Sequence, residues 1–293
     1  MNATTSTPAS PPPSARGLEE LILIAGKDDY PLLLARSARE QGVKRLVAIA
    51  FRGETKRAIA QYADEVRWLY LGQMKPFLDA LTQSGIKNAV MAGQITPGNL
   101  FNVRFDREAW ALLSGLKERN AHTIFGAIGD RIRSLGIELL PAYLFMESFM
   151  PAPGPIATRL PTEQEQADVQ LGLRVAKTAS AVEIGQTVVV KGGTVLAVEA
   201  FEGTDATIQR AGRLGGRGIV VVKVAKQGHD MRFDIPVIGE RTLKTLRKAR
   251  AAVLAVEARR TILLDRQRLA AQADAMGLCL LAVEARQEGT QTP

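Results

Sequence analysis

The sequence predicts a protein of two α/β domains, the first of which is built on a parallel sheet. Three observations lead to this prediction. Short apolar runs alternate with helical stretches of about ten residues, which is typical of βαβ units. The length of 293 residues favours about two domains. The segment 151–165 holds four prolines and no apolar periodicity, so we predict a linker there.

The first half of the chain predicts a domain over residues 18–150. Apolar runs predict strands at 21–26, 45–51, 66–71 and 87–95. Helical stretches between and after them are predicted at 31–40, 55–63, 74–84, 107–117 and 121–135. Because helices follow strands, we expect right-handed crossovers and a parallel sheet. The stretch "GIELLPAYLFM" predicts a further strand at the edge of this sheet.

The second half predicts another domain, over residues 166–286, followed by a tail at 287–293. It opens with a helix predicted at about 164–178. Strands are predicted at 186–193, 194–201, 218–226, 251–258 and 277–285. The sequence "LAVEA" occurs three times at irregular spacing. This pattern indicates that strands of similar sequence recur, and it does not indicate a solenoid repeat.

The N-terminal stretch and the single cysteine both bear on the compartment. Residues 1–17 are rich in Ser, Thr, Pro and Ala and lack a charged segment followed by an apolar one, so we predict a disordered tail and no secretory signal. No run of about 20 apolar residues predicts a membrane span. Cys279 lies in an apolar run and is predicted to be buried in a protein of a reducing compartment, the cytoplasm.

Composition and charge restrict the partners. Hydrophobic residues make up 46% of the chain and charged residues 23%, as in ordinary globular proteins. The net charge of +8 favours anionic partners such as phosphates or anionic lipid headgroups. Aromatic residues are only 5% and are not interleaved with the basic clusters, and no binding motif occurs, so nucleic acid is not predicted as a partner.

Two strand ends in the first domain carry candidate binding residues. Ligands of open α/β sheets bind outside the carboxyl ends of the strands. The first strand ends at Gly26 and Lys27, and the fourth at Gln94 and Thr96, so we predict one shared crevice there. The GxGxxG spacing of a dinucleotide site is absent, and an ordinary strand–helix turn would also explain the first stretch.

The stretch "VEAFEGTDATIQRAG" gathers acids at the end of an apolar strand. Glu199, Glu202 and Asp205 lie close together, and Thr204 can cap the helix that follows. Clustered carboxylates favour a hard cation such as Mg²⁺, while the start of a helix favours an anion. A phosphate-bound Mg²⁺ would satisfy both, although a capped turn with solvated acids explains the pattern as well.

Two further stretches supply cations. The loop "GRLGGRG" can cradle a phosphate beside Arg213, or it is a plain flexible loop. Lys223 and Lys226 leave a valine-rich strand, and Arg232 and Asp234 follow on one face of an extended segment. Cations that neutralise charge and an acid that holds metal or orients water are what phosphoryl chemistry needs.

These motifs resemble a known family. "GQTVVVKGGTVLAVEAFEGTDATIQRAG", followed by "GIVVVKVAKQGHDMRFDIPVIG", is similar to the metal-dependent UDP-2,3-diacylglucosamine pyrophosphatases of lipid A biosynthesis. The similarity is to the type with an N-terminal Rossmann-like domain and its own C-terminal α/β domain. It runs from about Leu21 to Ala285, and "IAGKDDYP" and "AGQI" carry it in the first half.

The resemblance implies a reaction and site residues. Water would attack the pyrophosphate of UDP-2,3-diacylglucosamine, releasing UMP and 2,3-diacylglucosamine 1-phosphate, with Mg²⁺ or Mn²⁺ assisting. Asp234 would be catalytic and would share the metal with Glu202 and Asp205. The substrate would be bound by the cationic, glycine and polar residues named above: Gly26, Lys27, Gln94, Thr96, Thr204, Arg213, Lys223, Lys226 and Arg232.

The resemblance also implies partners, and one departure supports an alternative. A homodimer is implied, and the lipid-bearing substrate and basic charge imply weak attachment to the anionic inner leaflet. Where the family has an acidic turn, this chain reads "ERNAHTIFGAIGD", so two carboxylates are missing. The alternative is therefore a non-catalytic or re-purposed member that binds a nucleotide-sugar or phospholipid.

Overall fold

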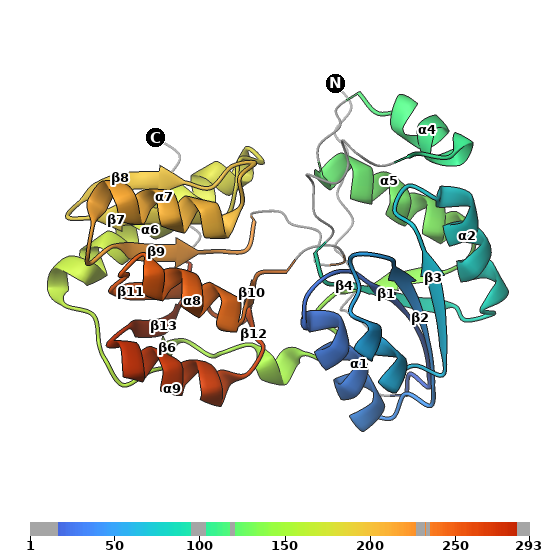
Figure 1. Ribbon diagram of the computed structural model, residues 1–293, viewed down its shortest axis with the longest axis horizontal. Coiled ribbons are helices and arrows are strands. Elements are labelled where there is room, and N and C mark those ends of the chain that lie inside the picture. Colours follow the sequence, from blue (N-terminus) through green and yellow to red (C-terminus); the bar gives the residue numbers. More distant parts are fainter. Residues whose placement is uncertain (1–16, 95–103, 118–120, 227–231, 233–234, 286–293) are drawn as a thin grey trace, which may run out of the picture. The chain divides into compact units, whose positions relative to one another are not determined.

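The chain folds into two compact units, residues 1–145 and 146–293, in the computed structural model (Figure 1). The structure describes residues 17–94, 104–117, 121–226, 232 and 235–285. The predicted tails at 1–17 and 287–293 lie almost wholly outside these residues. No described helix has the length and apolarity needed to cross a membrane.

Unit 1 is built on a five-stranded parallel sheet, which confirms the predicted parallel sheet. Its strand order is β3-β2-β1-β4-β5. The strands are β1 (Glu20–Ala25), β2 (Arg45–Phe51), β3 (Glu65–Leu69), β4 (Asn88–Ala92) and β5 (Glu138–Leu140). β1 and β2 are buried along almost their whole length, as expected for parallel strands that are covered on both faces. The predicted edge strand is confirmed as β5.

The helices of unit 1 follow the predicted order with one exception. They are α1 (Tyr30–Glu40), α2 (Met74–Gln83), α4 (Arg107–Ser114) and α5 (Ala121–Ser134). The α-helix predicted at 55–63 is wrong, because only a 3-10 helix forms there, η1 (Arg57–Gln61). Lys56 before it is extended, and Ile59 is the residue that η1 buries, so the segment offers too little apolar surface to stabilise a longer helix.

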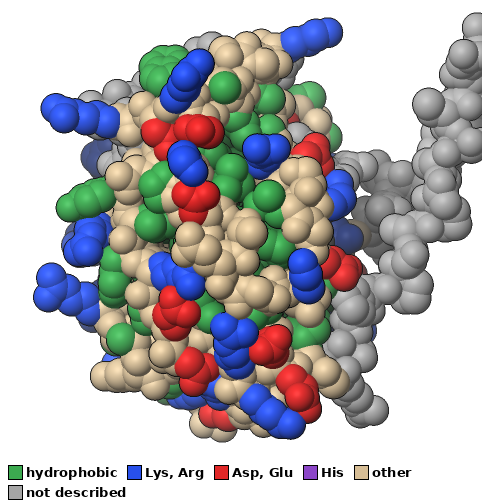
Figure 2. Space-filling view, turned by 90° about the vertical axis from the view of Figure 1, so that its right-hand side faces the viewer, with side chains coloured by type: hydrophobic (Ala, Val, Ile, Leu, Met, Phe, Trp, Pro, Cys, Tyr) green, Lys and Arg blue, Asp and Glu red, His purple; other side chains and the backbone are tan. Residues whose placement is uncertain are grey.

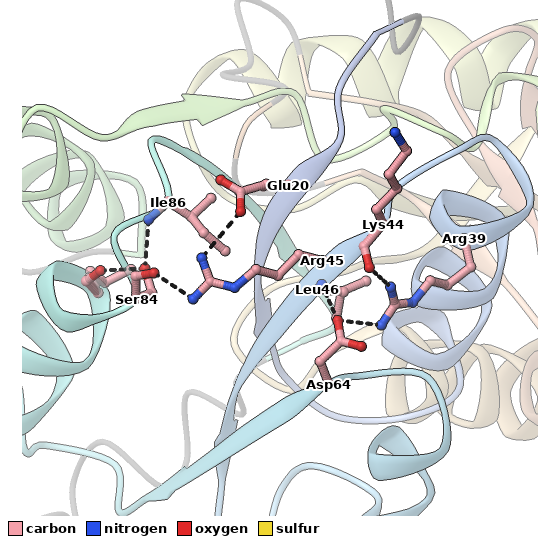
Figure 3. A network of polar contacts seen from close by, with 9 residues as sticks. Glu20, Arg39, Lys44, Arg45, Leu46, Asp64, Ser84 and Ile86 are labelled. Carbon is pink, nitrogen blue, oxygen red and sulfur yellow. Dashed lines mark hydrogen bonds and ion pairs between the residues drawn. The ribbon is translucent and has the colours of Figure 1, made fainter.

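A network of polar contacts joins the amino-terminal ends of the strands in unit 1 (Figure 3). The Asp64 carboxylate accepts hydrogen bonds from the Leu46 N–H and from Arg39, both at 2.7 Å. Arg45 pairs with Glu20 at 3.2 Å and donates to the Ser84 carbonyl. The Leu46 N–H, followed by Arg39, holds the pKa of Asp64 below its ordinary value.

Unit 2 is built on a six-stranded mixed sheet of order β6-β13-β11-β9-β7-β8. The central strands β9 (Val220–Lys223), β11 (Val253–Glu257) and β13 (Cys279–Val283) are parallel. β7 (Thr187–Lys191) is antiparallel both to β9 and to β8 (Thr194–Val198). The short strands β10 (Val237–Ile238) and β12 (Ile262–Leu263) form a separate two-stranded parallel sheet.

Helices cover both faces of this sheet (Figure 1). Alternate strand residues point to opposite faces. Val188, Val222 and Leu281 belong to the cluster beneath α6 (Glu163–Ala181). Their neighbours in sequence pack against three helices on the other face, α7 (Thr204–Gly215), α8 (Glu240–Lys248) and α9 (Arg266–Met276). Cys279 is buried as predicted, and burial raises the pKa of its thiol to about 11.

The β7–β8 hairpin closes through a two-glycine turn. Gly192 and Gly193 have φ values of +57° and +76°, which suit the type of turn that joins twisted antiparallel strands. The buried Asp168 of α6 accepts a hydrogen bond of 2.7 Å from each of their N–H groups. This contact ties the hairpin to the helix that precedes it.

The stretch predicted as a linker contributes to unit 2. η2 (Glu147–Phe149) precedes it, and β6 (Gly154–Pro155) pairs antiparallel with β13. The N–H groups of Ile156 and Ala157 both reach the Leu280 carbonyl. Pro155 therefore lies in an edge strand, where a missing N–H is tolerated.

Charges of both signs are mixed on one face of the molecule. On the face of the described residues that Figure 2 shows, Lys and Arg side chains are interspersed with Asp and Glu side chains. Several exposed charges of the described residues are paired, as in Lys44 with Glu19 and Lys75 with Asp79.

Candidate active site

One edge of the sheet in unit 2 collects the charged residues that follow its strands. β8, β9, β11 and β13 run in the same direction, so their carboxyl ends share an edge, and β7 begins there. Thr187 at the start of β7 is the register partner of Lys223 at the end of β9. This is the edge at which open α/β sheets bind ligands.

Glu199, Thr204 and Lys223 form a buried cluster at this edge. The Thr204 hydroxyl donates to Glu199 Oε1 at 2.8 Å, and Lys223 Nζ donates to Thr204 Oγ1 at 2.9 Å. Glu199 and Lys223 are each only 8% exposed. Among the described residues, Glu199 Oε2 is buried with no hydrogen-bond partner.

The local backbone explains how this cluster forms. Gly203, at φ +81°, turns the chain from β8 into α7 and occupies the N-cap position, so α7 starts at Thr204. The prediction that Thr204 caps the helix is wrong, because its hydroxyl bonds to Glu199 instead. Gly185 is required opposite, since a Cβ there would lie 2.1 Å from the Glu199 carbonyl oxygen.

A second group of charges lies where β9 and β11 end. The buried Glu257 accepts hydrogen bonds from Lys177 Nζ at 2.6 Å and from the Ala225 N–H at 2.8 Å. Lys177 also donates to the Ala225 carbonyl at 2.9 Å. Both backbone polar groups of Ala225 are therefore held. Lys226, the next residue, pairs with Glu183 at 2.9 Å.

The acids predicted as metal ligands have other partners. Glu202 pairs with Arg210 at 2.6 Å, and this arginine is the main cause of a pKa below the ordinary value. Asp205 pairs with Arg241 of α8 at 2.7 Å and accepts from Thr245 at 3.0 Å. Within the described part of the chain, no group of three or more His, Cys, Asp or Glu residues is arranged to hold a metal ion.

Several predicted residues are not joined to the cluster by the structure. Asp234 and Thr96 lie outside the described residues, and Arg232 is described between two segments that are not. Arg213 stands in the last turn of α7, about 13 Å along the helix axis from Thr204. Two of the glycines around it pack closely, because a Cβ on Gly212 would lie 2.9 Å from the Ala249 Cβ and a Cβ on Gly215 would lie 2.3 Å from Leu196 Cδ1.

The strand ends predicted in unit 1 do come together. Gly26 donates its N–H to the Ala92 carbonyl at 2.7 Å, and Lys27 donates to the Gln94 carbonyl at 2.9 Å. A Cβ on Gly26 would lie 2.5 Å from the Gly93 carbonyl oxygen. β1 and β4 are adjacent central strands where the chain changes direction across the sheet, which is the usual ligand position in such folds.

Sequence reasoning missed Lys177, Glu183 and Glu257. It counted Glu199 among the clustered acids, but Glu199 is not among the site residues that the family resemblance implies. The repeated "LAVEA" was the available signal, because it places Glu199 directly after β8, Glu257 at the end of β11 and Glu284 directly after β13, all on one edge. No comparable signal marks Lys177 or Glu183, which reach the edge from α6 and from the turn after it.

The fold and the site define a class of protein. A unit with a Rossmann-like parallel sheet is joined to an α/β unit whose strand ends present lysines beside the start of a helix, an arrangement suited to a phosphate-bearing ligand. Family models described as the LpxI N-terminal domain and the LpxI C-terminal domain match residues 20–149 and 152–281. The chain belongs to this family.

A curated relative supports the same assignment. The UDP-2,3-diacylglucosamine pyrophosphatase LpxI of Caulobacter vibrioides is 28% identical over 280 residues. The match covers 91% of this chain and 98% of the relative, so both units have counterparts.

Proposed function

We propose that this protein hydrolyses the pyrophosphate of UDP-2,3-diacylglucosamine, releasing UMP and 2,3-diacylglucosamine 1-phosphate. Membership of the family and the name of the relative support this substrate. The structural observation that carries the proposal is the buried Lys223, which is hydrogen-bonded to Thr204 at the start of α7. A buried lysine beside a helix N-terminus suits a polyanionic ligand.

The proposal gives roles to the cations, to one acid and to the start of α7. Lys223 and Lys226 would neutralise the charge that develops on the pyrophosphate oxygens, and the N–H groups at the start of α7 would bind the same oxygens. Asp234, the acid that the family resemblance marks as catalytic, would act on the attacking water. Gly26, Lys27 and Gln94, at the strand ends of unit 1, remain candidate substrate-binding residues.

A requirement for Mg²⁺ or Mn²⁺ is part of the proposal, but the described acids do not form its site. The Glu202 and Asp205 carboxylates are each engaged by an arginine. Glu199 Oε2 is the buried carboxylate oxygen that lacks a partner among the described residues. A bound metal would supply charge neutralisation at the pyrophosphate.

The cellular setting follows from the substrate. The two acyl chains hold the substrate in a leaflet, so we propose a cytoplasmic protein that attaches weakly to the inner face of the membrane. We also propose that it acts as a homodimer.

The test is release of UMP from UDP-2,3-diacylglucosamine in the presence of Mg²⁺, measured by chromatography. Lys223→Met keeps the stem of the side chain but removes the charge, so we expect the rate to fall by about 10²- to 10³-fold with little change in melting temperature. Lys191→Met is the matched control. Lys191 lies at the opposite end of β7, where it donates to the Gly215 and Arg217 carbonyls, so its loss should leave the rate near that of the wild type.

Other outcomes separate the alternatives. Wild-type protein that binds the substrate without releasing UMP would indicate a re-purposed binding protein. Equal rates for Lys223→Met and Lys191→Met would contradict the placement of the site. Full turnover in excess chelator would remove the metal requirement.

A further inference from the structure

Glu199 is a buried acid to which the proposed hydrolysis assigns no role. It follows β8, is 8% exposed, and has a carboxylate oxygen without a partner among the described residues. A buried carboxylate is costly unless it is paired, so its position at the edge of the candidate site calls for a physical reason.

The hydrogen bonds of Thr204 fix the direction of the contacts in this cluster. A threonine hydroxyl has one proton to donate, and a lysine ammonium can only donate. Since Lys223 donates to Thr204 Oγ1 at 2.9 Å, the threonine proton is free to be given to Glu199 Oε1 at 2.8 Å. The chain of donation therefore runs from Lys223 through Thr204 to Glu199. Thr187 Oγ1 makes a longer contact of 3.4 Å with Thr204 Oγ1.

The side chain of Glu199 reaches Lys223 only through Thr204. Thr204 is the side-chain partner that the structure gives to Glu199, and no ion pair within 4.0 Å joins Glu199 to Lys223 in the described residues. The negative charge of Glu199 nevertheless lies one hydroxyl away from the ammonium, where it offsets the cost of burying a cation. One N–H of Lys223 is directed to Thr204, and within the described part of the chain the other two have no partner and can bind an anion.

We infer that Glu199 is a positioning residue, which orients the Lys223 ammonium toward a bound pyrophosphate through the Thr204 hydroxyl. This inference rests on the proposed function for its substrate. It extends that function by giving a role to the glutamate before the "EGTD" motif and by making the Thr204 hydroxyl a relay instead of a helix cap.

Thr204 variants provide the first test. Thr204→Val keeps the shape of the side chain but removes the hydroxyl, whereas Thr204→Ser keeps the hydroxyl. We expect kcat/KM to fall about 10- to 100-fold in Thr204→Val and to stay within about 3-fold of the wild type in Thr204→Ser. Equal losses in the two variants would overturn the inference, because the hydroxyl would then not be the group that matters.

A double-mutant cycle provides the second test. Glu199→Gln removes the charge at nearly constant shape, and alone it should lower kcat/KM by about 10-fold. If Glu199 acts through Thr204, adding Glu199→Gln to Thr204→Val should cause little further loss. An additive loss would indicate a purely structural role for Glu199 and would overturn the inference. If Glu199→Gln does not fold, the Thr204→Val and Thr204→Ser pair still decides.

A binding measurement separates this inference from the proposed function. Titration calorimetry with inorganic pyrophosphate needs no turnover. We expect Thr204→Val to weaken pyrophosphate binding about 5- to 10-fold and Thr204→Ser to restore it, even if the wild type proves unable to hydrolyse the UDP-sugar. Wild-type protein that does not bind pyrophosphate, or Thr204→Val that binds it as well as the wild type, would overturn the inference.

Discussion

Identical short motifs place single glutamates in quite different surroundings in this protein. Glu199 and Glu257, from two copies of "LAVEA", are buried and contact a threonine and a lysine respectively. Glu284, from the third copy, is exposed and pairs with Arg259 at 2.9 Å. The neighbouring elements, and not the motif, decide which of these acids is buried.

Asp64 allows a pH-dependent prediction at the residue scale. Its pKa is lowered in the folded state, chiefly by the Leu46 N–H and then by Arg39. A lowered folded-state pKa stabilises the protein above the unfolded-state value of about 3.9, and this contribution is lost as the pH falls through the folded-state value. We expect Asp64→Asn to lower the free energy of unfolding by about 0.5–1.5 kcal/mol near neutral pH.

Urea unfolding of Asp64→Asn and wild type between pH 7 and pH 3 measures this effect. The difference should narrow below about pH 4. Asp64 is half exposed, so the low end of the range is expected. A difference that stays constant across this pH range would show that the charge of Asp64 is not responsible.

At the scale of elements, Glu257 joins α6, β9 and β11. Glu257→Gln would weaken the bonds to Lys177 and to the Ala225 N–H, so we expect it to lower the free energy of unfolding by about 1.5–3 kcal/mol. Glu284→Gln is the matched control, because its ion pair is exposed and should cost less than about 1 kcal/mol. Denaturant unfolding measures both, and equal effects would contradict the role given to Glu257.

The contact between β1 and β4 supports a second prediction at this scale. Gly26→Ala would place a Cβ against backbone at Gly93, and backbone cannot move aside as a flexible side chain can. We expect a loss of about 1–3 kcal/mol in the free energy of unfolding.

Gly126→Ala is the control for this variant. Gly126 lies in α5 with open space around its Cβ position, so the change should be neutral or stabilising by up to about 1 kcal/mol. A Gly26→Ala protein as stable as Gly126→Ala would show that the close approach of the two strand ends does not require glycine at position 26.

At the scale of the whole molecule, the net charge is +8, and on the face that Figure 2 shows the Lys and Arg side chains lie among Asp and Glu side chains. We therefore expect weak and salt-sensitive binding to vesicles that contain phosphatidylglycerol. Sedimentation should recover more protein with such vesicles in 0.01 M salt, where the Debye length is about 30 Å, than in 1 M salt, where it is about 3 Å. Phosphatidylcholine vesicles are the control, and binding that persists in 1 M salt would contradict an electrostatic attachment.

The chain's two α/β halves and the parallel sheet of unit 1 could be predicted because they depend on local patterns. Apolar runs such as "RLVAIAF" are buried on both faces whichever neighbours they pair with, and the structure confirms this strand as β2. The two-glycine turn at 192–193 was equally visible, although the hairpin it forms was not predicted from it.

The sequence by itself determined that Thr204 stands at the start of a helix and Lys223 at the end of a strand. Ligands of open α/β sheets bind at such strand ends. Only the tertiary structure decided which acid joins them. Glu199, Glu202 and Asp205 lie within one short stretch, yet the first turns inward to Thr204 while the other two turn to Arg210 and Arg241. Arg241 comes from another helix, and Lys177 reaches Glu257 across 80 positions of sequence. Such pairings depend on how helices pack across the sheet, and no local periodicity encodes the side on which a polar side chain finds its partner.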